Sequence, residues 1–493
     1  MALRFLDFAY RESGLASVAS TGRDAVLVIL ARSCRMIAYG SSSLVLSLFL
    51  ASLPGVSDAR IGLFMTLTLA GDVVLSLALT LLADRLGRRR TLLLGALMMI
   101  ASGTAFALFE NYWVLLLAAV VGVLSATGGD FGPFRAIEES VISQLTQPET
   151  RADVLVWYVT TASLGSSVGT ELAGRVIEWL RASRGWELVD CYHACFWSYV
   201  AMGLVNVCCG LALSKRCELQ SSGPEKETAE GLTEAALPAD SGAATAGKAA
   251  VRQRPKKRWL AQISRETRSI MLALWFLLMV DSLADGITNM SLTTYYLDRK
   301  FHVAKSTLGD VLSASYFLCT VSTIFAGPLA RRIGLVNTMV FTHIPSSAAV
   351  LLFPFPDSVT LTFGLLLLRV GLNNMDQAPR AALIAAVVKP EERTSVMGIT
   401  SMLRTVAATT GPTVTGILAE GDKFWIAFVV AGSLRLAYDL GLFAMFIDIN
   451  LHKYEAVRSK DTEAEGEPTD PDEEDIEEDG DEGLQMLSPR PSN

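Results

Sequence analysis

Charged side chains and histidines are scarce in this chain of 493 residues. Lysine, arginine, aspartate and glutamate together make up 19% of it and hydrophobic residues 51%, whereas about 25% of an average soluble protein is charged. The 4 histidines and 7 cysteines lack the paired spacing of a zinc site or a disulfide framework. A Gly-x-x-x-x-Gly-Lys-Ser/Thr segment for nucleotide binding is also missing. These absences argue against a soluble enzyme, a metalloprotein and a carrier driven by ATP.

The negative charge of the chain is concentrated near its C-terminus. Residues 461–482 contain 14 carboxylates and no lysine or arginine, so the formal charge of −8 leaves +6 for the rest of the chain. The overall acidity therefore describes this tail and does not indicate an acidic binding surface. We expect the tail to be solvated and to serve solubility or trafficking, with a regulatory or docking role as the alternative.

Long apolar runs dominate the rest of the sequence. A bilayer core roughly 30 Å thick needs about 20 mainly apolar residues per helix, and twelve stretches of that kind can be placed. We therefore predict an all-α membrane protein with twelve transmembrane helices. The predicted spans are residues 24–52, 60–83, 90–109, 112–143, 153–179, 192–213, 269–297, 305–330, 336–354, 358–388, 395–419 and 422–449.

Basic residues cluster in three of the connecting loops. Arg85 and residues 88–90 follow the second predicted span, Arg331 and Arg332 follow the eighth, and five basic residues lie in 252–258, between the sixth and the seventh. Positive charge marks the cytosolic side of a membrane, so the three loops and both termini are predicted to be cytosolic. We expect the plasma membrane, with a vacuole-like membrane as the alternative, and we interpret 252–258 as an anchor on anionic lipid.

The segment between the two groups of six spans is rich in alanine, glycine, glutamate, threonine and serine. Such a composition over residues 221–250 cannot bury a core, which predicts a disordered linker. The predicted organisation is a cytosolic N-terminal segment (1–23), a six-helix half (24–213), a cytosolic linker (214–268), a second six-helix half (269–449) and an acidic cytosolic tail (450–493).

The two halves repeat each other in sequence. Four separate matches have offsets between 242 and 247, which predicts a duplicated six-helix unit. Residues 82–87 match 329–334, residues 148–151 match 390–393, Gly169 and Gly174 match Gly411 and Gly416, and Gly40 matches Gly286.

The loop after the second predicted span reads Leu-Ala-Asp-Arg-Leu-Gly-Arg-Arg over residues 82–89. It resembles the signature of the major facilitator superfamily, Gly-x-Leu-Ala-Asp-Arg-x-Gly-Arg-Lys/Arg, with Thr80 in place of the leading glycine. The resemblance covers essentially the whole membrane portion, and residues 129–134 and 374–380 are similar to strings of a poorly characterised microbial subgroup. It implies a rocker-switch carrier in which helices 1, 4, 7 and 10 line a central cavity, 2, 5, 8 and 11 flank it, and the others support it from outside.

Ionisable residues inside membrane spans are costly, so each one marks a candidate functional position. Asp281, Asp285 and Asn289 are spaced by four in the seventh predicted span and would share one face of a helix. Arg32 and Arg35 share a face of the first span, and Arg35 is related to Asp281 by an offset of 246. We therefore predict that Arg35 and Asp281 form a pH- or substrate-sensitive ion pair across the cavity, with a permanent structural pair as the alternative.

Further charges lie in the second, fourth and tenth predicted spans. Asp72 is isolated in the second span and would suit a group that binds and releases a proton, with a hydrogen bond to a neighbouring helix as the alternative. Arg135 can reach Glu139, and Asp376 can reach Arg380, each at a spacing of four. The residues predicted to line the transport cavity or to couple protons are Arg32, Arg35, Asp72, Asp130, Arg135, Asp281, Asp285, Asn289, Arg369 and Asp376.

The loop signature also predicts a gate on the cytosolic side. Asp84 can accept hydrogen bonds from the N-terminal end of a neighbouring helix, where the helix dipole favours an anion. Gly87 permits a tight turn, Arg88 can clamp an acidic partner, and Arg331 replaces the aspartate in the second copy, which predicts an asymmetric gate. The predicted gate residues are Asp84, Arg85, Gly87, Arg88 and Arg331, together with Glu138, Glu139 and Arg380, which would face Arg151 and Arg393.

Three residues are expected to be structural. Arg435 and Asp439, four apart in the last predicted span, are interpreted as an intrahelical pair, because the superfamily places this helix outside the cavity. His343 in the ninth predicted span is interpreted as a satisfied buried imidazole and not as a proton relay.

We predict a secondary active transporter of a small organic solute, driven by the proton gradient, without cofactor or metal, and functional as a monomer. Efflux is favoured because no sugar or phosphate importer pattern is recognisable, although Thr170 stands where exporters of the superfamily commonly have proline.

The alternatives are a proton symporter that imports an anionic or zwitterionic nutrient, held by Arg35 or Arg369, and a membrane sensor that does not transport. Neither enzymatic activity nor binding to nucleic acid is expected, since no nucleophile–base arrangement is recognisable; the expected partners are the substrate and the lipid bilayer.

Overall fold

A computed structural model describes residues 15–122, 124–125, 134–147, 150–218, 265–377, 379–380, 383–384, 388 and 393–446. All of these residues belong to the first of the two units into which the chain divides, residues 1–448 and 449–493. The regular secondary structure within the described ranges is helical throughout. The all-α prediction is therefore confirmed.

Long helices joined by short loops form the N-terminal half. A short helix, α2 (Leu15–Thr21), precedes them, and a single 3-10 turn, η1 (Lys215–Cys217), follows them. Each of the first six predicted spans coincides with one helix, except the fourth, which contains two. The helices are α3 (Arg23–Ser52), α4 (Asp58–Leu86), α5 (Arg88–Leu108), α6 (Tyr112–Val121), α7 (Phe134–Leu145), α8 (Arg151–Arg184) and α9 (Leu188–Ala212).

The C-terminal half follows the same plan. The seventh predicted span contains two helices, and the others each contain one long helix within the described residues. The helices are α10 (Arg265–Ile287), α11 (Met290–Phe301), α12 (Lys305–Ile333), α13 (Leu335–Leu352), α14 (Val359–Asn373), α16 (Arg393–Glu420) and α17 (Phe424–Phe446).

Length and composition identify the described helices that can cross a bilayer. Seven are long and apolar enough, and α10 with α11 makes an eighth if this bent pair counts as one span. A membrane protein with several crossings is thus supported, while the full number of twelve stays a prediction.

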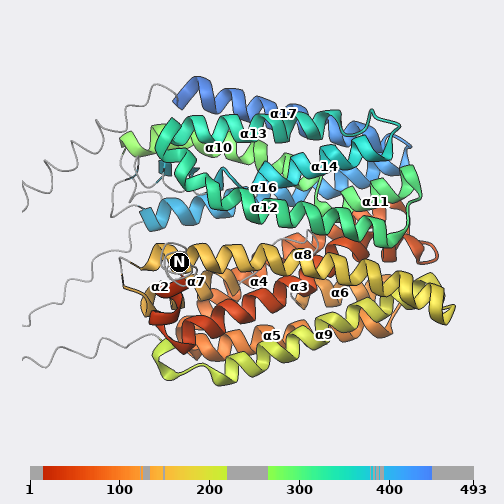
Figure 1. Ribbon diagram of the computed structural model, residues 1–493, viewed down its shortest axis with the longest axis horizontal. Helices are drawn as coiled ribbons and strands as arrows, with labels where there is room; N and C mark the ends of the chain where they lie inside the picture. The colour runs from red at the N-terminus through yellow and green to blue at the C-terminus, as the bar shows by residue number, and fades with distance from the viewer. Residues whose placement is uncertain are drawn as a thin grey trace, which may run out of the picture. The chain divides into compact units, whose positions relative to one another are not determined.

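The sequence repeat is also a repeat in helix packing. A β-carbon on Gly40 of α3 would lie 2.3 Å from the carbonyl oxygen of Ser166 in α8, and one on Gly286 of α10 would lie 2.0 Å from that of Ala408 in α16. Ser166 and Ala408 are 242 residues apart, an offset already present in the sequence matches. Glycine therefore lets α3 approach α8 as closely as α10 approaches α16, and both helix pairs run side by side in Figure 1.

A second repeated feature is the turn that follows α4 and α12. Gly87 and Gly334 occupy these turns with φ angles of 93° and 90°, in a region that residues with a side chain rarely adopt. They are 247 residues apart. The tight turn predicted at Gly87 is confirmed, and the second half repeats it.

The seventh predicted span is broken, which the sequence reading did not anticipate. Helix α10 ends at Ile287, α11 begins at Met290, and the two are bent by 41°. Asn289 caps α11, because its side-chain oxygen accepts a hydrogen bond of 2.9 Å from the backbone N–H of Leu292. The prediction that Asn289 continues the helical face of Asp281 is therefore wrong.

Aromatic side chains concentrate where α3 ends in one half and where α11 ends in the other. The ring of Phe49 lies 5.4 Å from that of Phe196, and the ring of Phe428 lies 4.6 Å from Tyr296 and 5.0 Å from Phe353. Aromatic pairs at such distances contribute about 0.5–1.5 kcal/mol beyond the burial of their area. They stabilise the helix ends opposite the loops that are predicted to be cytosolic.

Candidate functional site

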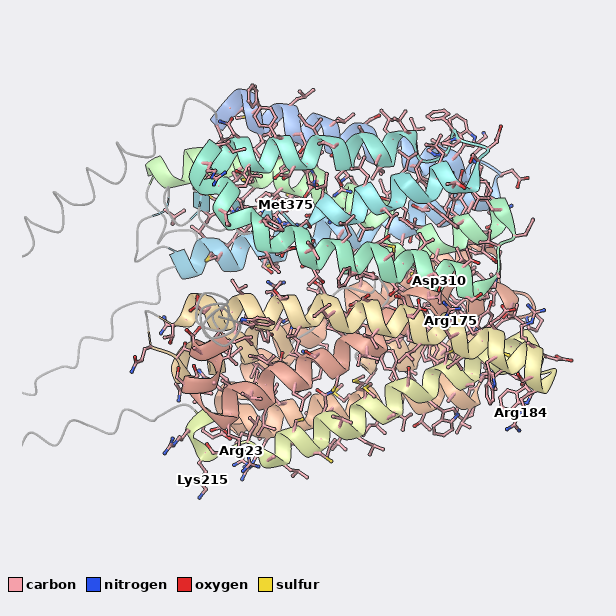
Figure 2. The ribbon with its side chains drawn as sticks, viewed as in Figure 1. Arg23, Arg175, Arg184, Lys215, Asp310 and Met375 are labelled. Atoms are coloured by element: carbon pink, nitrogen blue, oxygen red, sulfur yellow. The ribbon has the colours of Figure 1, made fainter. Side chains whose placement is uncertain are left out.

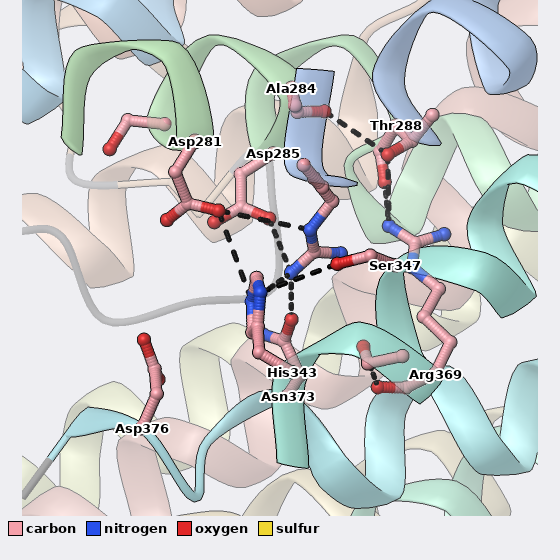
Figure 3. A network of polar contacts seen from close by, with 12 residues as sticks. Asp281, Ala284, Asp285, Thr288, His343, Ser347, Arg369, Asn373 and Asp376 are labelled. Carbon is pink, nitrogen blue, oxygen red and sulfur yellow. Dashed lines mark hydrogen bonds and ion pairs between the residues drawn. The ribbon is translucent and has the colours of Figure 1, made fainter. Parts of the chain in front are cut away.

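Asp281 of α10 is the centre of a polar network inside the C-terminal half (Figure 3). Its side chain is 2% exposed and lies 3.8 Å from guanidinium nitrogens of Arg380 and Arg435, 3.9 Å from His343 Nε2 and 4.0 Å from Arg404 Nη2. These partners come from the segment after α14, from α17, from α13 and from α16. Charge attraction is strong at such distances in a buried environment, so Asp281 links four parts of this half.

Asp285 lies one turn further along α10 and differs from Asp281 in its contact with solvent. Its carboxylate lies 3.3 Å from Arg435 Nη2, and its side chain is 36% exposed. Since both carboxylates approach Arg435, the prediction that Asp281 and Asp285 share one helix face is confirmed. Asp285 therefore offers the network a contact with the solvent that Asp281 does not have.

The predicted intrahelical pair of Arg435 and Asp439 is wrong, because both side chains bind neighbours on other helices. Arg435 donates a hydrogen bond to Asn373 Oδ1 and lies 3.1 Å from His343 Nε2. Asp439 accepts a hydrogen bond of 2.7 Å from Ser347 Oγ and lies 2.7 Å from His343 Nδ1. His343 thus bridges the two residues, and its interpretation as a satisfied buried imidazole is confirmed.

Asp376 and Arg380 form the ion pair that their spacing predicts, with 3.1 Å between Arg380 Nη1 and Asp376 Oδ2. Both side chains are buried, and Arg380 also approaches Asp281. Arg380 is therefore part of the buried network, and its role in a cytosolic gate stays a prediction.

Arg369 of α14 holds the break between α10 and α11. Its Nη1 donates a hydrogen bond of 2.9 Å to Thr293 Oγ1, and its Nη2 donates to the carbonyl oxygen and the hydroxyl of Thr288. A cation suits this position, since the C-terminal end of α10 carries the negative end of the helix dipole. Arg369 is buried by these contacts.

A separate ion pair lies inside the N-terminal half. Arg35 of α3 donates hydrogen bonds of 2.9 and 2.8 Å to the two carboxylate oxygens of Glu138 in α7, and the hydroxyl of Tyr158 donates a third, of 2.8 Å, to Glu138. Both partners of the ion pair are almost fully buried. The predicted pair of Arg35 with Asp281 is therefore wrong, whereas the assignment of Glu138 to a cytosolic gate stays a prediction.

The other predicted residues of the N-terminal half have different surroundings. The guanidinium of Arg32 lies 3.9 Å above the ring of Tyr158, and Asp72 is buried in α4. Arg135 and Glu139 form the predicted pair at 2.7 Å, and both are partly exposed. Asp130 lies outside the described residues, as do the side chains of Asp84, Arg85, Arg331 and Arg393.

Glu218 was not singled out from the sequence, and its carboxylate binds at the N-terminal end of a helix beside the loop signature. Its Oε2 accepts a hydrogen bond of 2.7 Å from the backbone N–H of Arg88, at the N-terminal end of α5. The Arg88 side chain donates to Gln144, and Arg151 donates to the carbonyl of Ser143, so neither is paired with an acidic gate residue in these bonds. Glu218 follows the sixth predicted span and so lies on the same predicted side of the membrane as the loop of residues 82–89. This position was the signal from which it could have been found.

At the opposite end the two halves are in direct contact. A β-carbon on Gly416 of α16 would lie 2.8 Å from Gly62 of α4, and one on Gly174 of α8 would lie 3.1 Å from Gly309 of α12. These two crossings are related by the repeat, because Gly309 follows Gly62 by 247 residues and Gly416 follows Gly174 by 242. The structure is therefore closed at the end that is predicted to face away from the cytosol.

An ionic contact, the Arg299 latch, reinforces this closure and was also missed from the sequence. Arg299 of α11 lies 2.5 Å from Asp58 at the start of α4 and 2.8 Å from Asp422 between α16 and α17. The hydroxyl of Tyr295 donates a hydrogen bond of 2.6 Å to Asp58 as well. The latch thus connects the beginning of α4 with two elements of the other half.

The family model of the Major Facilitator Superfamily matches residues 28–273 and 274–483, one match for each half. The chain belongs to this superfamily. It is 33% identical over 431 residues to the uncharacterised membrane protein YJR124C of Saccharomyces cerevisiae, a match that covers 87% of this chain and 95% of that protein.

Solved structures of superfamily transporters share the fold. The nucleoside transporter NupG matches with a TM-score of 0.60 at 14% identity, over 86% of this chain and 99% of NupG. The inward open xylose transporter XylE from E. coli matches with a TM-score of 0.61 at 12% identity, over 88% and 99% of the two chains. The chain is therefore a multi-pass membrane protein of a transporter superfamily, built from two related halves.

The predicted spans give the network an expected position relative to a transport path. Asp281, Asp285 and Arg369 lie in the seventh and tenth predicted spans, which the resemblance to the superfamily predicts to line a central cavity. His343 and Arg435 lie in the ninth and twelfth predicted spans, which it predicts to lie outside. That the network connects cavity-lining spans with supporting ones stays a prediction.

Proposed function

We propose that this protein is a proton-coupled secondary active transporter that exports a small organic solute by alternating access. The observation that carries the proposal is the position of Asp281, a buried carboxylate between three guanidinium groups and an imidazole on four neighbouring elements. It lies six residues before the end of α10, where the cavity-lining span is broken. A charge that changes there acts on several helices at once.

Coupling of proton binding to helix movement follows from the balance of charge around Asp281. A proton or a cationic substrate group that neutralises Asp281 removes part of the attraction that holds Arg380, Arg404 and Arg435, and a buried charge without compensation is costly. These guanidinium groups would then turn toward the remaining carboxylates and move the helices that carry them. Asp285 supplies the route for exchange with solvent, because it is partly exposed and already contacts Arg435.

Alternating access requires that the closed end open in another state. The two glycine crossings and the Arg299 latch are the contacts that must separate, and the repeat relates the two crossings to each other. Two related six-helix halves that rock about a central site are the general form of such carriers. The closed end supports the view that the described conformation is accessible from the predicted cytosolic side.

Import of an anionic or zwitterionic nutrient is the second candidate, and Arg404 is the observation that favours it. Arg404 is partly exposed, and its Nε donates a hydrogen bond of 2.9 Å to Ser282 on the cavity-lining span. It is a better candidate for holding an anion than Arg35 or Arg369, whose guanidinium groups are engaged with Glu138 and with the helix break.

The test compares metabolites in cells and medium by untargeted mass spectrometry. Matched host cells would lack the gene or carry it intact, as Asp281→Asn, or as Asp190→Asn. Asp190 is an exposed aspartate in the first turn of α9 and serves as the control for loss of one carboxylate. We expect one compound to be enriched in the medium with the intact and Asp190→Asn proteins and retained inside the cell with Asp281→Asn.

Other outcomes separate the alternatives. Loss of the enrichment on addition of a protonophore would support proton coupling, and export that persists without a proton gradient would contradict it. Depletion of a compound from the medium would reverse the direction and favour import. If no compound differs while a signalling phenotype survives Asp281→Asn, the protein is a sensor and the transport proposal is wrong.

A further inference from the structure

Basic side chains surround a pocket at the end of the N-terminal half that is predicted to be cytosolic. The pocket has a volume of about 500 Å³ and is formed by the end of α4, the first turns of α5 and the segment around η1. Three of its lining residues are cationic, one is anionic and two are apolar. They are Arg89, Arg90, Lys215, Glu218, Leu86 and Leu93.

The wall of the pocket that contains Lys215 and Glu218 is held by hydrogen bonds. The backbone N–H and the hydroxyl of Ser214 donate to the carboxylate of Asp24, over 2.9 and 2.5 Å. Gln144 Nε2 donates to the carbonyl oxygens of Arg216 and Glu218, each over 2.9 Å. This part of the predicted linker therefore packs on the half that precedes it, and Lys215 lies at the same end of the molecule as Arg23 in Figure 2.

The burial of Cys217 supports the same placement. Cys217 lies in η1 and is fully buried against the N-terminal half. Burial raises the pKa of its thiol to about 11. Because the side chain of Cys217 is buried, η1 forms part of a packed wall.

The positive charge of the pocket is only partly balanced by the described chain. The carboxylate of Glu218 is bound by the backbone N–H of Arg88, and Arg89 donates one hydrogen bond, of 3.4 Å, to the carbonyl of Leu211. Arg90 and Lys215 form no ion pair with another described residue. The N-terminal end of α5 adds the positive end of its helix dipole. The local potential therefore favours an anion.

Exposed leucines of α5 and α9 lie near the pocket. Leu93 of α5 packs on Gly210 of α9, so the two helices touch directly beside the pocket. Leu97 of α5 and Leu211 of α9 are exposed on either side of this contact. Exposed leucines next to a basic pocket at the predicted membrane surface match an amphiphile with an anionic headgroup and acyl chains.

We propose that this pocket binds the phosphate headgroup of an anionic phospholipid from the cytosolic leaflet, with its acyl chains against the exposed leucines of α5 and α9. Arg90 and Lys215 neutralise the phosphate, and Arg89 lines the floor of the pocket. Basic pockets between transmembrane helices on the cytosolic side recognise anionic headgroups in this way. The lipid would also hold η1, and with it the start of the linker that joins the two halves.

The test uses the purified full-length protein and native mass spectrometry with added phosphatidylserine, phosphatidylcholine or inorganic phosphate. The double variant Arg90→Gln with Lys215→Gln removes two exposed charges that make no contact on which folding depends. The matched control, Arg184→Gln with Lys423→Gln, removes the same two charge types from exposed positions at the opposite end, and Arg184 is labelled there in Figure 2.

We expect the intact protein to prefer phosphatidylserine over phosphatidylcholine and the double variant to lose roughly 10- to 30-fold in affinity for phosphatidylserine, with the control unchanged. An unchanged affinity in the double variant, or an equal loss in the control, would overturn the proposal. Inorganic phosphate that competes as strongly as the lipid would also overturn it, because the pocket would then bind a free anion.

Discussion

The two halves repeat each other in backbone packing and differ in how they arrange their buried charges. In the N-terminal half, Arg35 and Glu138 form one pair through two short hydrogen bonds. In the C-terminal half, three described guanidinium groups and the imidazole of His343 lie 3.8–4.0 Å from Asp281. A pair with short, directed bonds fixes one arrangement, whereas a network of longer contacts can redistribute its charges. Duplication has therefore kept the helix packing and let the polar interior diverge.

The first span of each half also differs in its backbone: it is continuous in the N-terminal half and broken in the C-terminal half. Helix α3 runs without interruption from Arg23 to Ser52, while the equivalent span in the second half is divided into α10 and α11. The break is capped by Asn289 and bound by Arg369. Irregular backbone inside a membrane protein is tolerated where protein groups satisfy it, and these two side chains do so.

The largest expected effect comes from breaking the fixed pair. Glu138→Gln removes the charge that is bound to Arg35 and should lower the free energy of unfolding by about 3–5 kcal/mol, the usual cost of losing one partner of a buried ion pair. Asp281→Asn should cost less stability, because the described guanidinium groups lie 3.8–4.0 Å from its carboxylate, beyond hydrogen-bonding distance, and should affect transport more. Denaturant unfolding of the purified variants in detergent measures the difference.

The control for Glu138→Gln is the neighbouring Glu139→Gln, which affects a partly exposed pair. A stability loss of equal size in both variants would mean that burial of the pair does not matter. A larger loss in Asp281→Asn than in Glu138→Gln would contradict the contrast between the halves.

The repeat in helix packing can be tested at two equivalent glycines. Gly40→Ala and Gly286→Ala each put a β-carbon against a backbone carbonyl, and overpacking of this kind costs about 1–3 kcal/mol. We expect similar losses in thermal stability from both. Gly364→Ala is the control, since its β-carbon would meet no atom within 4 Å. Clearly unequal losses at the equivalent positions would contradict a shared packing geometry.

The break in the C-terminal half is tested by removing its cap. Asn289→Ala should lower the free energy of unfolding by about 1 kcal/mol, the typical value of a helix N-cap. Asn111→Ala removes a comparable cap from α6 in the N-terminal half, where the Asn111 side chain accepts hydrogen bonds from two backbone N–H groups. Stability should fall equally in both, and transport of the identified solute should fall in Asn289→Ala alone. Equal transport by the two variants would show that the break serves stability only.

The smallest effect is expected at the exposed pair of the N-terminal half. Arg135→Gln removes a contact at helical spacing between partly exposed side chains, which is worth about 0.3–0.5 kcal/mol. The thermal midpoint should change little and should become less sensitive to salt. A loss as large as that of Glu138→Gln would mean that the pair is shielded from solvent in the membrane.

Local spacing predicted the pairs that one helical segment can make by itself. Arg135 with Glu139 and Asp376 with Arg380 meet because side chains four apart lie on one face of a helix. The partner of Arg35 was not predictable in this way, since which residues meet across a bundle depends on how each helix is rotated. Arg35 has a carboxylate within its own half and does not reach across the cavity.

The same limit explains the wrong interpretation of the last helix. Arg435 and Asp439 have the spacing of a pair, yet Asp281, Asp285 and His343 on neighbouring helices bind them instead. Spacing shows which contacts are possible, and the competition among neighbours decides which form. The sequence contained the charges of the network without showing that five helical segments bring them together.

The sequence by itself determined the helices, their duplication and the glycine turn at Gly87, because hydrophobic length, repeated motifs and a positive φ angle are local properties. Only the tertiary structure decided that Arg35 pairs with Glu138 inside the N-terminal half and that a network forms around Asp281 in the other half. The same is true of the break before Asn289 and of the closed end at Gly62 and Gly416. These features depend on helix rotation and close approach, which many distant residues set together.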